Sequence, residues 1–587
     1  MDWIILFLKQ MKAYYLFFVI NLLIGEVLFT DITSDAGISF SGMSEGVCVF
    51  DYNNDGFDDI LFTTRGGSTI HLYKNNGGIN FTNVSIESNV GQEMEARTAI
   101  AGDYDNDGDL DLFIGATIGS SKFFQNNGDG TFQDITNLTG IYVNDQVRGC
   151  SWFDFNQDGY LDLYVGLLFE PNLLYKNNGD GTFIDIAQNV GATGPIGAGI
   201  IMGLGAIDYN RDGYQDLYIT QDNYNGNILL KNENGIFFTD VSYSSQTNLE
   251  VMGMGIAFGD INKDGLFDFY TTNLNENSLL LNSSNGSFSD ISFTSGTQDM
   301  LGSMGWGTFF FDANNDGWID IYNNNETAFG GVYNSLMINQ KNLTFSMLGP
   351  SCGAIINNNG YGSAFSDFDH DGDLDMILVG HSSNVGSINL LRNDSEARNW
   401  VMFDLQQNQN NFYAVGATVE LFSGNEKQIN YIAAGNGYCS QNTFDIHFGL
   451  DTINYIDSVK IIWPDNQDEV FYGINVNNKN ILIRGDGSLM GKLNQTSPTT
   501  SNFSIKNIYP NPFNTETTVS IQAHENIRPT LQLFDLKGNL LKENIYELRG
   551  NKNHFIRLSL DTYPTGLYFV RVVSRSHIIT KKIQLLK

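Results

Sequence analysis

One acidic nonapeptide recurs seven times in this chain of 587 residues and constrains its fold more than any other feature. Its pattern is D-x-[N/D]-x-D-G-x-x-D, and an apolar run of β type follows each copy. A fixed period of about 52 residues is typical of repeated units stacked as an array or closed as a propeller. The copies begin at Asp51, Asp103, Asp154, Asp208, Asp260, Asp312 and Asp367.

Each nonapeptide offers the ligands that Ca²⁺ prefers. Side chains at positions 1, 3, 5 and 9 supply oxygens, and the backbone carbonyl of position 7 can add another. Ca²⁺ takes six to eight oxygens at about 2.3–2.6 Å, whereas Mg²⁺ keeps its waters. We therefore predict up to seven calcium ions. The predicted side-chain ligands are Asp51, Asn53, Asp55, Asp59, Asp103, Asp105, Asp107, Asp111, Asp154, Asn156, Asp158, Asp162, Asp208, Asn210, Asp212, Asp216, Asp260, Asn262, Asp264, Asp268, Asp312, Asn314, Asp316, Asp320, Asp367, Asp369, Asp371 and Asp375.

Other readings of the loop fit less well. Position 6 is always glycine, which predicts a turn through positive φ. Position 12, where an EF-hand places Glu, is never acidic, and a strand pattern rather than a helix follows, which also disfavours a dockerin-type loop. The remaining alternative is a metal-free Asx/Gly turn, but its crowded carboxylates would repel one another without a cation.

The loops also account for much of the net charge of −35. Positions 1, 5 and 9 hold three carboxylates in each of seven copies, and Asp105 and Asp369 bring the total to 23 of 66 acidic residues. Seven bound Ca²⁺ would return 14 positive charges. The acidity therefore indicates metal sites and solubility, and it argues against nucleic acid as a partner, because that needs a basic face.

Each repeat carries four strand-like segments. In the middle repeats they are Gly203–Ile207 before a loop, Asp216–Ile219 after it, and then segments like Leu173–Asn177 and Phe183–Ile186 joined by Asn-Gly-Asp-Gly. Such a tetrapeptide is a strong hairpin signal. Four strands repeated seven times predict an all-β fold with a seven-bladed β-propeller.

Two details indicate a closed ring. Six of the seven residues found five positions before a loop are glycine, which suits strands crowded at a central axis; they are Gly46, Thr98, Gly149, Gly203, Gly255, Gly307 and Gly362. An F-x-D-I segment, Phe29–Ile32, precedes the first loop, and none clearly follows Leu390–Asp394. We therefore expect the N-terminal segment to supply the fourth strand of the last blade.

Residues 29–393 resemble the FG-GAP/VCBS repeat family, known from integrin α-chain propellers and bacterial surface proteins. Ala257–Asp260 (AFGD) comes close to the motif behind that name. The resemblance implies Ca²⁺ between the first and second strand of each blade. It implies no single function, because this fold hosts adhesion, glycan binding and enzymes.

The N-terminal residues 1–28 are predicted to be a secretion signal peptide. Lys12 precedes an apolar run, Tyr14–Ile24, that is shorter than the roughly 20 residues a membrane span needs. Met11 is a plausible start. A membrane anchor is the alternative, because no A-x-A site precedes Phe29; otherwise the mature chain should have no stable membrane span.

Residues 394–486 resemble the ASPIC/UnbV domain, which often follows such repeats, as in proteins similar to cartilage acidic protein, and whose biochemical role is unsettled. We expect a small β-rich domain in which His447 has a structural role, and Arg484-Gly-Asp486 is a coincidental tripeptide. The segments that carry the resemblance are Asn399–Val401, Ala414–Glu420, Gly435–Gln441, His447–Leu450 and Val459–Pro464.

Residues 487–506 are predicted to be a linker because they are rich in Ser, Thr and Asn. Residues 507–587 are similar to the type A C-terminal sorting domain of the type IX secretion system, through Asn507–Phe513, Leu533–Gly538 and Tyr563–Tyr568. The resemblance implies an immunoglobulin-like β-sandwich, the type IX machinery as partner, and a secreted or outer-surface location in a Gram-negative bacterium. A plain immunoglobulin-like module is the alternative.

A ligand site is predicted on the face opposite the loops, where an extracellular glycan or protein would bind. Its candidate wall is the register six residues before each loop, which changes from charged to apolar and aromatic; the alternative is that these residues only pack on neighbouring strands. They are Glu45, Arg97, Arg148, Met202, Met254, Trp306 and Tyr361.

A calcium-dependent binding or adhesion module is the preferred function. The alternative is a polysaccharide lyase or hydrolase, but the propeller holds only eleven Lys or Arg and three His, and no catalytic motif. We therefore predict no enzyme activity. The four cysteines show no metal-ligand spacing and are expected to be buried thiols.

Overall fold

The described part of the chain is all-β apart from four short helical turns, and the chain divides into two compact units, residues 1–492 and 493–587. The signal-peptide prediction falls almost entirely outside the described residues. The turns are α2 (Thr136–Thr139), α3 (Ala187–Val190), α4 (Ser292–Ser295) and η1 (Pro350–Cys352). The computed structural model describes residues 27–40, 42–194, 199–299, 304–326, 333–382, 385–407, 410–485, 489–491, 503–511, 513–524, 526–534, 540–550, 552–574 and 577–587.

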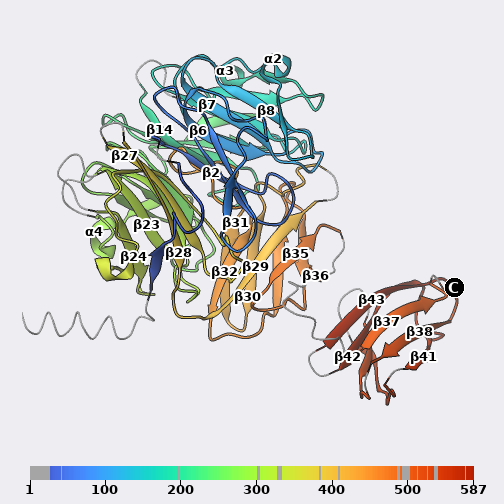
Figure 1. The fold of residues 1–587 in the computed structure, drawn as a ribbon. Helices are drawn as coiled ribbons and strands as arrows, with labels where there is room; N and C mark the ends of the chain where they lie inside the picture. Colours follow the sequence, from blue (N-terminus) through green and yellow to red (C-terminus); the bar gives the residue numbers. More distant parts are fainter. Residues whose placement is uncertain are drawn as a thin grey trace, which may run out of the picture. The chain divides into compact units, whose positions relative to one another are not determined.

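The described part of residues 29–393 forms seven antiparallel sheets of four strands, one sheet for each repeat (Figure 1). The first four are β2(Val47–Phe50)-β3(Asp59–Phe62)-β4(His71–Asn75)-β5(Phe81–Asn83), β6(Glu95–Gly102)-β7(Asp111–Ile118)-β8(Lys122–Asn126)-β9(Phe132–Asp134), β10(Val147–Phe153)-β11(Asp162–Leu167)-β12(Leu173–Asn177)-β13(Phe183–Asp185) and β14(Ile201–Ile207)-β15(Asp216–Gln221)-β16(Ile228–Glu233)-β17(Phe237–Asp240). The last three are β18(Ile256–Gly259)-β19(Asp268–Thr271)-β20(Ser278–Asn282)-β21(Phe288–Asp290), β22(Met304–Phe311)-β23(Asp320–Glu326)-β24(Ser335–Asn339)-β25(Phe345–Met347) and β26(Gly360–Ser366)-β27(Asp375–Ser382)-β28(Val385–Asn393)-β1(Phe29–Asp31).

The sheets are arranged in a closed ring. Their first strands contact one another in the cycle β2, β6, β10, β14, β18, β22, β26 and back to β2. The ring closes through β1, where Phe29 lies opposite Asn393, so the prediction that the N-terminal segment completes the last sheet is confirmed. This is the arrangement of a β-propeller.

The glycines five positions before the loops are crowded at the axis, as predicted. A Cβ built on Gly255 would approach the carbonyl oxygen of Trp306 on the next first strand to 2.0 Å. The corresponding approaches are 2.5 Å for Gly307 and 2.6 Å for Gly362. Since real Cβ atoms do not come so close to backbone, a side chain at any of these three positions would push the neighbouring first strand away.

The second domain, residues 394–491, packs on the propeller as part of the same compact unit (Figure 1). Its core is continuous with that of the second and third sheets, so that Trp152 and Phe183 belong to one buried cluster with Val419 and Trp463. Its two sheets are β32(Ile446–Asp451)-β29(Asn399–Gln406)-β35(Lys479–Ile483)-β36(Leu489–Gly491), in which β29 and β35 run parallel, and β31(Glu426–Tyr431)-β30(Thr418–Ser423)-β33(Ser458–Ile462)-β34(Asp468–Phe471).

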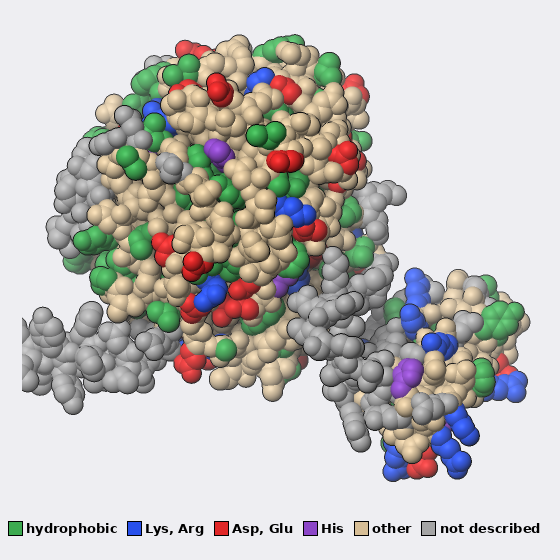
Figure 2. Space-filling model, viewed as in Figure 1, with side chains coloured by type: hydrophobic (Ala, Val, Ile, Leu, Met, Phe, Trp, Pro, Cys, Tyr) green, Lys and Arg blue, Asp and Glu red, His purple; other side chains and the backbone are tan. Residues whose placement is uncertain are grey.

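The C-terminal unit has two sheets around one core that includes Phe503, Val519 and Val570. Lys and Arg side chains gather on it (Figure 2). The predicted linker is shorter than 487–506, because β36 pairs with β35 and β37 starts at Phe503; the immunoglobulin-like topology stays a prediction. The sheets are β37(Phe503–Tyr509)-β38(Glu516–Ala523)-β41(Lys552–Ser559) and β40(Leu540–Ile545)-β39(Thr530–Phe534)-β42(Gly566–Ser574)-β43(His577–Leu585).

Candidate functional site

The seven acidic loops share one backbone conformation. In the first loop, the Asp51 carboxylate accepts the N–H groups of Asp55 at 3.2 Å and Gly56 at 2.7 Å, and the same pair of bonds recurs in all seven loops. The predicted positive φ at position 6 is confirmed, with 89° at Gly56. Position 1 thus shapes the turn, and its carboxylate oxygens retain further lone pairs.

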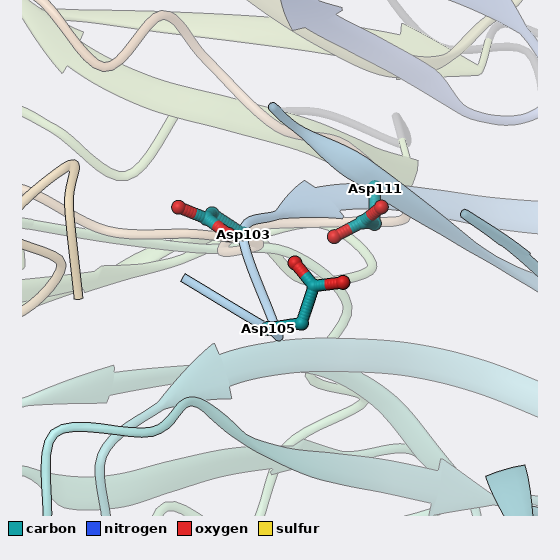
Figure 3. A group of neighbouring side chains, drawn as sticks. All are labelled: Asp103, Asp105 and Asp111. Atoms are coloured by element: carbon teal, nitrogen blue, oxygen red, sulfur yellow. The ribbon is translucent and has the colours of Figure 1, made fainter. Parts of the chain in front are cut away.

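Two loops bring three carboxylates together. In the second loop one oxygen each from Asp103, Asp105 and Asp111 lies within 4.8 Å of the other two, and the side chains converge (Figure 3). Asp367, Asp369 and Asp375 do the same in the seventh loop. Ligands around one Ca²⁺ lie no more than about 5 Å apart, twice the metal–oxygen distance. Both clusters therefore fit a bound cation.

Burial and mutual repulsion raise the pKa values of these carboxyl groups. Burial raises the pKa of Asp103 to about 7, with a further contribution from the charges of Asp107 and Asp105. The pKa of Asp111 is also raised well above its ordinary value, first by burial and then by Asp105. Carboxylates held this close and this deep carry their charge at neutral pH only if a cation compensates it.

The remaining loops replace the third carboxylate with Asn at position 3. In four loops a lysine ammonium lies within 4.0 Å of the position 5 carboxylate, as Lys176 does at 3.0 Å from Asp158. The second and seventh loops have four carboxylates and no such lysine. We therefore expect these two loops to bind a divalent cation most tightly.

Sequence reasoning missed an asparagine that ties each loop to the one before it. It lies at or one residue before the end of the third strand of each sheet, and its side-chain amide donates to the backbone carbonyl of position 2 in the preceding loop at 2.8–3.0 Å. Asn75 bonds back to Phe368 and so closes the circle. The L-L-Y-K-N pattern contained this signal. The residues are Asn75, Asn126, Asn177, Asn232, Asn282, Asn339 and Asn393.

Position 4 lies in the left-handed region in all seven copies, and in some of them its side chain links neighbouring loops. Asn106, Gln157 and Asn315 donate to the carbonyl of the position 6 glycine in the next loop at 3.1, 2.8 and 3.1 Å. Positive φ is costly for a side chain larger than glycine. The loops are therefore one connected structure rather than seven independent turns.

The second domain covers this loop end of the propeller. The Tyr413 hydroxyl lies 3.0 Å from Asn54 in the first loop and 2.9 Å from the carbonyl of Gly108 in the second. Asn410 packs on Gly159 in the third loop. Glu420 and Glu426 form ion pairs with position 4 of the fourth and fifth loops, at Arg211 and Lys263. In the sixth and seventh loops, the carbonyl of Asn315 accepts the Asp451 N–H at 2.7 Å, and that of Gly372 lies 3.1 Å from His447 Nε2.

The second domain also sends a segment into the ring, residues 433–441, which we call the axial segment. The carbonyl of Ala434 accepts the Trp152 N–H at 2.8 Å, and Gln441 exchanges two backbone hydrogen bonds with β2. Ser440 Oγ accepts the N–H of Ser363 at 3.2 Å. The domain is thus joined to the propeller both at the loops and along the axis.

Comparison with known families now identifies the parts. An FG-GAP-like repeat matches at residues 51–114, 103–165, 208–271 and 260–323, an ASPIC and UnbV domain at 407–488, and a secretion system C-terminal sorting domain at 507–585. The chain combines FG-GAP repeats, an ASPIC/UnbV domain and a secretion sorting domain. The second domain is therefore the ASPIC/UnbV domain, and the sorting domain marks a secreted or surface protein.

Curated relatives match part of this chain. Cartilage acidic protein 1 of Homo sapiens is 23% identical over 73% of this chain and 60% of its own length. The Xenopus tropicalis protein is 28% identical over 33% of this chain and 31% of its own length. The chain thus spans about a third to three fifths of the length of the curated relatives it matches.

A solved structure of BBS1N in complex with ARL6DN aligns with 63% of this chain and 98% of its own at 12% identity, with a TM-score of 0.40. The SapL1 lectin in complex with alpha methyl fucoside aligns with 55% and 98% at 9% identity, with a TM-score of 0.32. Similarity at this level carries no argument about function. In the described part of the chain, no helix has the length and apolar character needed to cross a membrane.

The predicted ligand wall at the axis is wrong for six of its seven residues. They are at most 9% exposed, because Tyr438 and Cys439 of the ASPIC/UnbV axial segment fill the space between the first strands. The Tyr438 ring lies 4.8 Å from that of Trp306, and its hydroxyl accepts a hydrogen bond from Arg97 at 3.0 Å. The alternative, packing on neighbours, is correct for Glu45, Arg97, Met202, Met254, Trp306 and Tyr361.

A buried ionic cluster lies next to Tyr438 of the axial segment. Glu45 is 1% exposed and lies 2.5 Å from both Arg65 and Arg97 and 3.2 Å from His381. Burial raises the pKa of Glu45, but the charge of Arg97, with His381 and Arg65, outweighs this and leaves the pKa below its ordinary value. The cluster therefore holds a charged Glu45 at neutral pH.

His447 has the structural role that the sequence predicted. It is buried beneath Gly372, and burial lowers its pKa to about 4, so the imidazole is neutral in the folded chain. All four cysteines are buried and unpaired, as expected.

Proposed function

We propose that this protein is a calcium-dependent binding module that acts at the outer surface of a Gram-negative bacterium or in its surroundings. The type IX secretion machinery exports it, and its ligand is an extracellular glycan or protein. Up to seven calcium ions stabilise a seven-bladed propeller. The observation that carries the proposal is the division of the propeller into a covered loop end and an opposite end left to ligands.

The chemistry of the loops supports calcium as the stabilising ion. Their donors are carboxylate, amide and carbonyl oxygens, which are hard ligands, and no sulfur or imidazole takes part. The residues that would hold each ion are those of positions 1, 3, 5 and 9, with the carbonyl of position 7. Because the ASPIC/UnbV domain contacts every loop, bound calcium would also stabilise its attachment.

The enzyme alternative has less support. The acidic groups near the axis are occupied, since Glu45 is paired with arginines and Glu326 accepts hydrogen bonds from Trp306 at 2.9 Å and Tyr361 at 3.1 Å. A general acid or base has to reach its substrate. Buried, paired carboxylates are better suited to holding the axial segment.

The test is binding of the full chain to glycan and protein arrays in Ca²⁺ and in EDTA, with the calcium content measured on the same sample. We expect calcium to be bound and binding of a defined ligand to require it. Asp103→Asn with Asp105→Asn should lower the calcium content by one ion, whereas Asp129→Asn in the exposed β8–β9 turn should not. A calcium-free protein that binds equally well would contradict the proposal.

A further inference from the structure

One basic side chain of the propeller differs from all the others. Residues 29–393 contain eleven Lys and Arg, all of them described, and ten lie within 4.0 Å of a carboxylate. The exception is Arg148, whose buried Nε has no hydrogen-bond partner in the described chain. In a protein with 66 acidic and 31 basic residues, an arginine without a carboxylate is unexpected.

Arg148 lies at the end of the propeller opposite the loops. It is the bulged residue between Val147 and Gly149 in the pairing of β10 with β11, and the calcium loop follows the other end of β10. A bulge re-aims a side chain relative to the sheet. The Arg148 carbonyl accepts a hydrogen bond from Cys439 Sγ at 3.1 Å, so this residue borders the tip of the axial segment.

No carboxylate among the described residues lies within 4.0 Å of the Arg148 guanidinium. Arg97 holds the same register in the neighbouring first strand, β6, and donates a hydrogen bond to Tyr438. The carboxylate of Glu45 forms ion pairs with both Arg97 and Arg65. Unlike the other six residues of its register, Arg148 keeps part of its surface exposed. Of these three arginines, Arg148 is thus the one without a carboxylate within 4.0 Å, and its guanidinium can bind an anion from solution.

The same end of the propeller also exposes aromatic rings. The connections between second and third strands end there, since the calcium loops join first to second strands at the other end. In those connections Phe169 is 59%, Tyr224 62% and Tyr333 53% exposed. Exposed rings with amide neighbours such as Asn223 suit the apolar faces of sugars.

We propose that Arg148 binds a carboxylate or sulfate group carried by an otherwise neutral glycan at the end of the propeller opposite the acidic loops. The inference rests on the proposed binding function and names the ligand class for it. The net charge of −35 would repel a polyanion, whereas a neutral chain with a single acidic group meets far less repulsion and can place that group on the unpaired guanidinium. The guanidinium fork can bond both oxygens of such a group.

The test is calorimetry of the full chain in saturating Ca²⁺ with matched saccharides. The pairs are a xylo-oligosaccharide with and without one glucuronate, and a galacto-oligosaccharide with and without one sulfate. We expect each acidic member to bind at least about tenfold more tightly than its neutral partner, as expected for a charge-assisted contact. Arg148→Gln should remove that difference, and Arg148→Lys should keep part of it.

Lys122→Gln is the control, because it removes one charge from β8, where Lys122 pairs with Asp134 in solvent. It should leave both affinities unchanged. If Arg148→Gln fails to fold, the Arg148→Lys variant and the salt dependence of wild-type binding decide, since the preference for the acidic member should fall as ionic strength rises.

Equal affinity for acidic and neutral saccharides would overturn the Arg148 site and leave the binding function standing. Unchanged binding by Arg148→Gln would do the same. Binding of a neutral peptide with a free C-terminal carboxylate, lost in Arg148→Gln, together with no binding of any saccharide, would overturn the assignment to a glycan. No binding of any probe, while the arrays still find a ligand, would overturn the inference alone.

Discussion

The two ends of the propeller differ in regularity. At the loop end, the same turn and the same interloop hydrogen bonds recur seven times, and the ASPIC/UnbV domain contacts every copy. At the other end the connections vary in length and sequence, and aromatic and charged side chains are exposed. The contrast teaches that repetition in this chain serves the fold, and that variation is found at the end to which the proposed function assigns the ligand.

Calcium removal should have the largest effect, because all of the predicted calcium sites lie at the loop end. At free calcium of ten times Kd one site contributes about 1.4 kcal/mol, so seven independent sites contribute on the order of 10 kcal/mol. We expect the unfolding transition of residues 1–492 to fall steeply in EDTA and to return with Ca²⁺ but not with Mg²⁺. Differential scanning calorimetry measures it, with the transition of the C-terminal unit as an internal reference. An unchanged first transition would mean that the loops need no metal.

Tyr438→Ala should have the next largest effect, because it empties the space that Tyr438 fills between the first strands of the sheets. The ring is 1% exposed, and loss of a buried aromatic side chain costs about 3–5 kcal/mol. Chemical denaturation of the full chain in Ca²⁺ measures the loss. The control is Tyr472→Ala, since Tyr472 is 60% exposed in the same domain. Similar stability of the two variants would show that the axial segment does not hold the ring.

Glu45→Gln tests the charged cluster at the variable end. Removing one partner of a buried ion pair leaves Arg97 uncompensated, with a cost of about 3 kcal/mol at pH 7. Because the folded pKa of Glu45 is below its ordinary 4.5, its stabilisation is complete above pH 4.5 and is lost as the pH falls further. The difference between wild type and variant should therefore shrink below pH 4.5. A difference that is constant from pH 7 to 3 would exclude an ionic origin.

Asn177→Ala should have the smallest effect, of about 1–2 kcal/mol. It removes one of the seven interloop hydrogen bonds, from Asn177 to the carbonyl of Tyr104, and leaves a buried acceptor unsatisfied. Asn178→Ala, at the exposed neighbouring position, is the control. The two free energies of unfolding are compared in Ca²⁺. Equal values would mean that the circle of bonds adds no stability.

The sequence alone was sufficient for the propeller, because its signals repeat. Strands and turns that would be uncertain in one short segment are clear when the same residues recur in seven copies. The unmatched Phe29–Ile32 segment indicated how the ring closes. The burial of Trp306 and Tyr361 could not be predicted in this way. It depends on Tyr438, which lies in a different domain. Tyr438 belongs to no repeat, so no sequence pattern indicates its contact with these residues. Asn177 and its equivalents recur in the sequence, but only the structure shows that each bonds to the preceding loop.

The axial segment has a consequence for how the chain matures. Strand β1 at residues 29–31 pairs with residues 391–393, and the tip that fills the ring comes later still, at residues 438 and 439. Contacts between such distant residues form slowly, because long loops must close before they stabilise anything. A chain that ends before residue 441 therefore lacks the piece that completes its interior. The propeller and the ASPIC/UnbV domain are therefore expected to fold as one unit rather than as two domains finished in sequence.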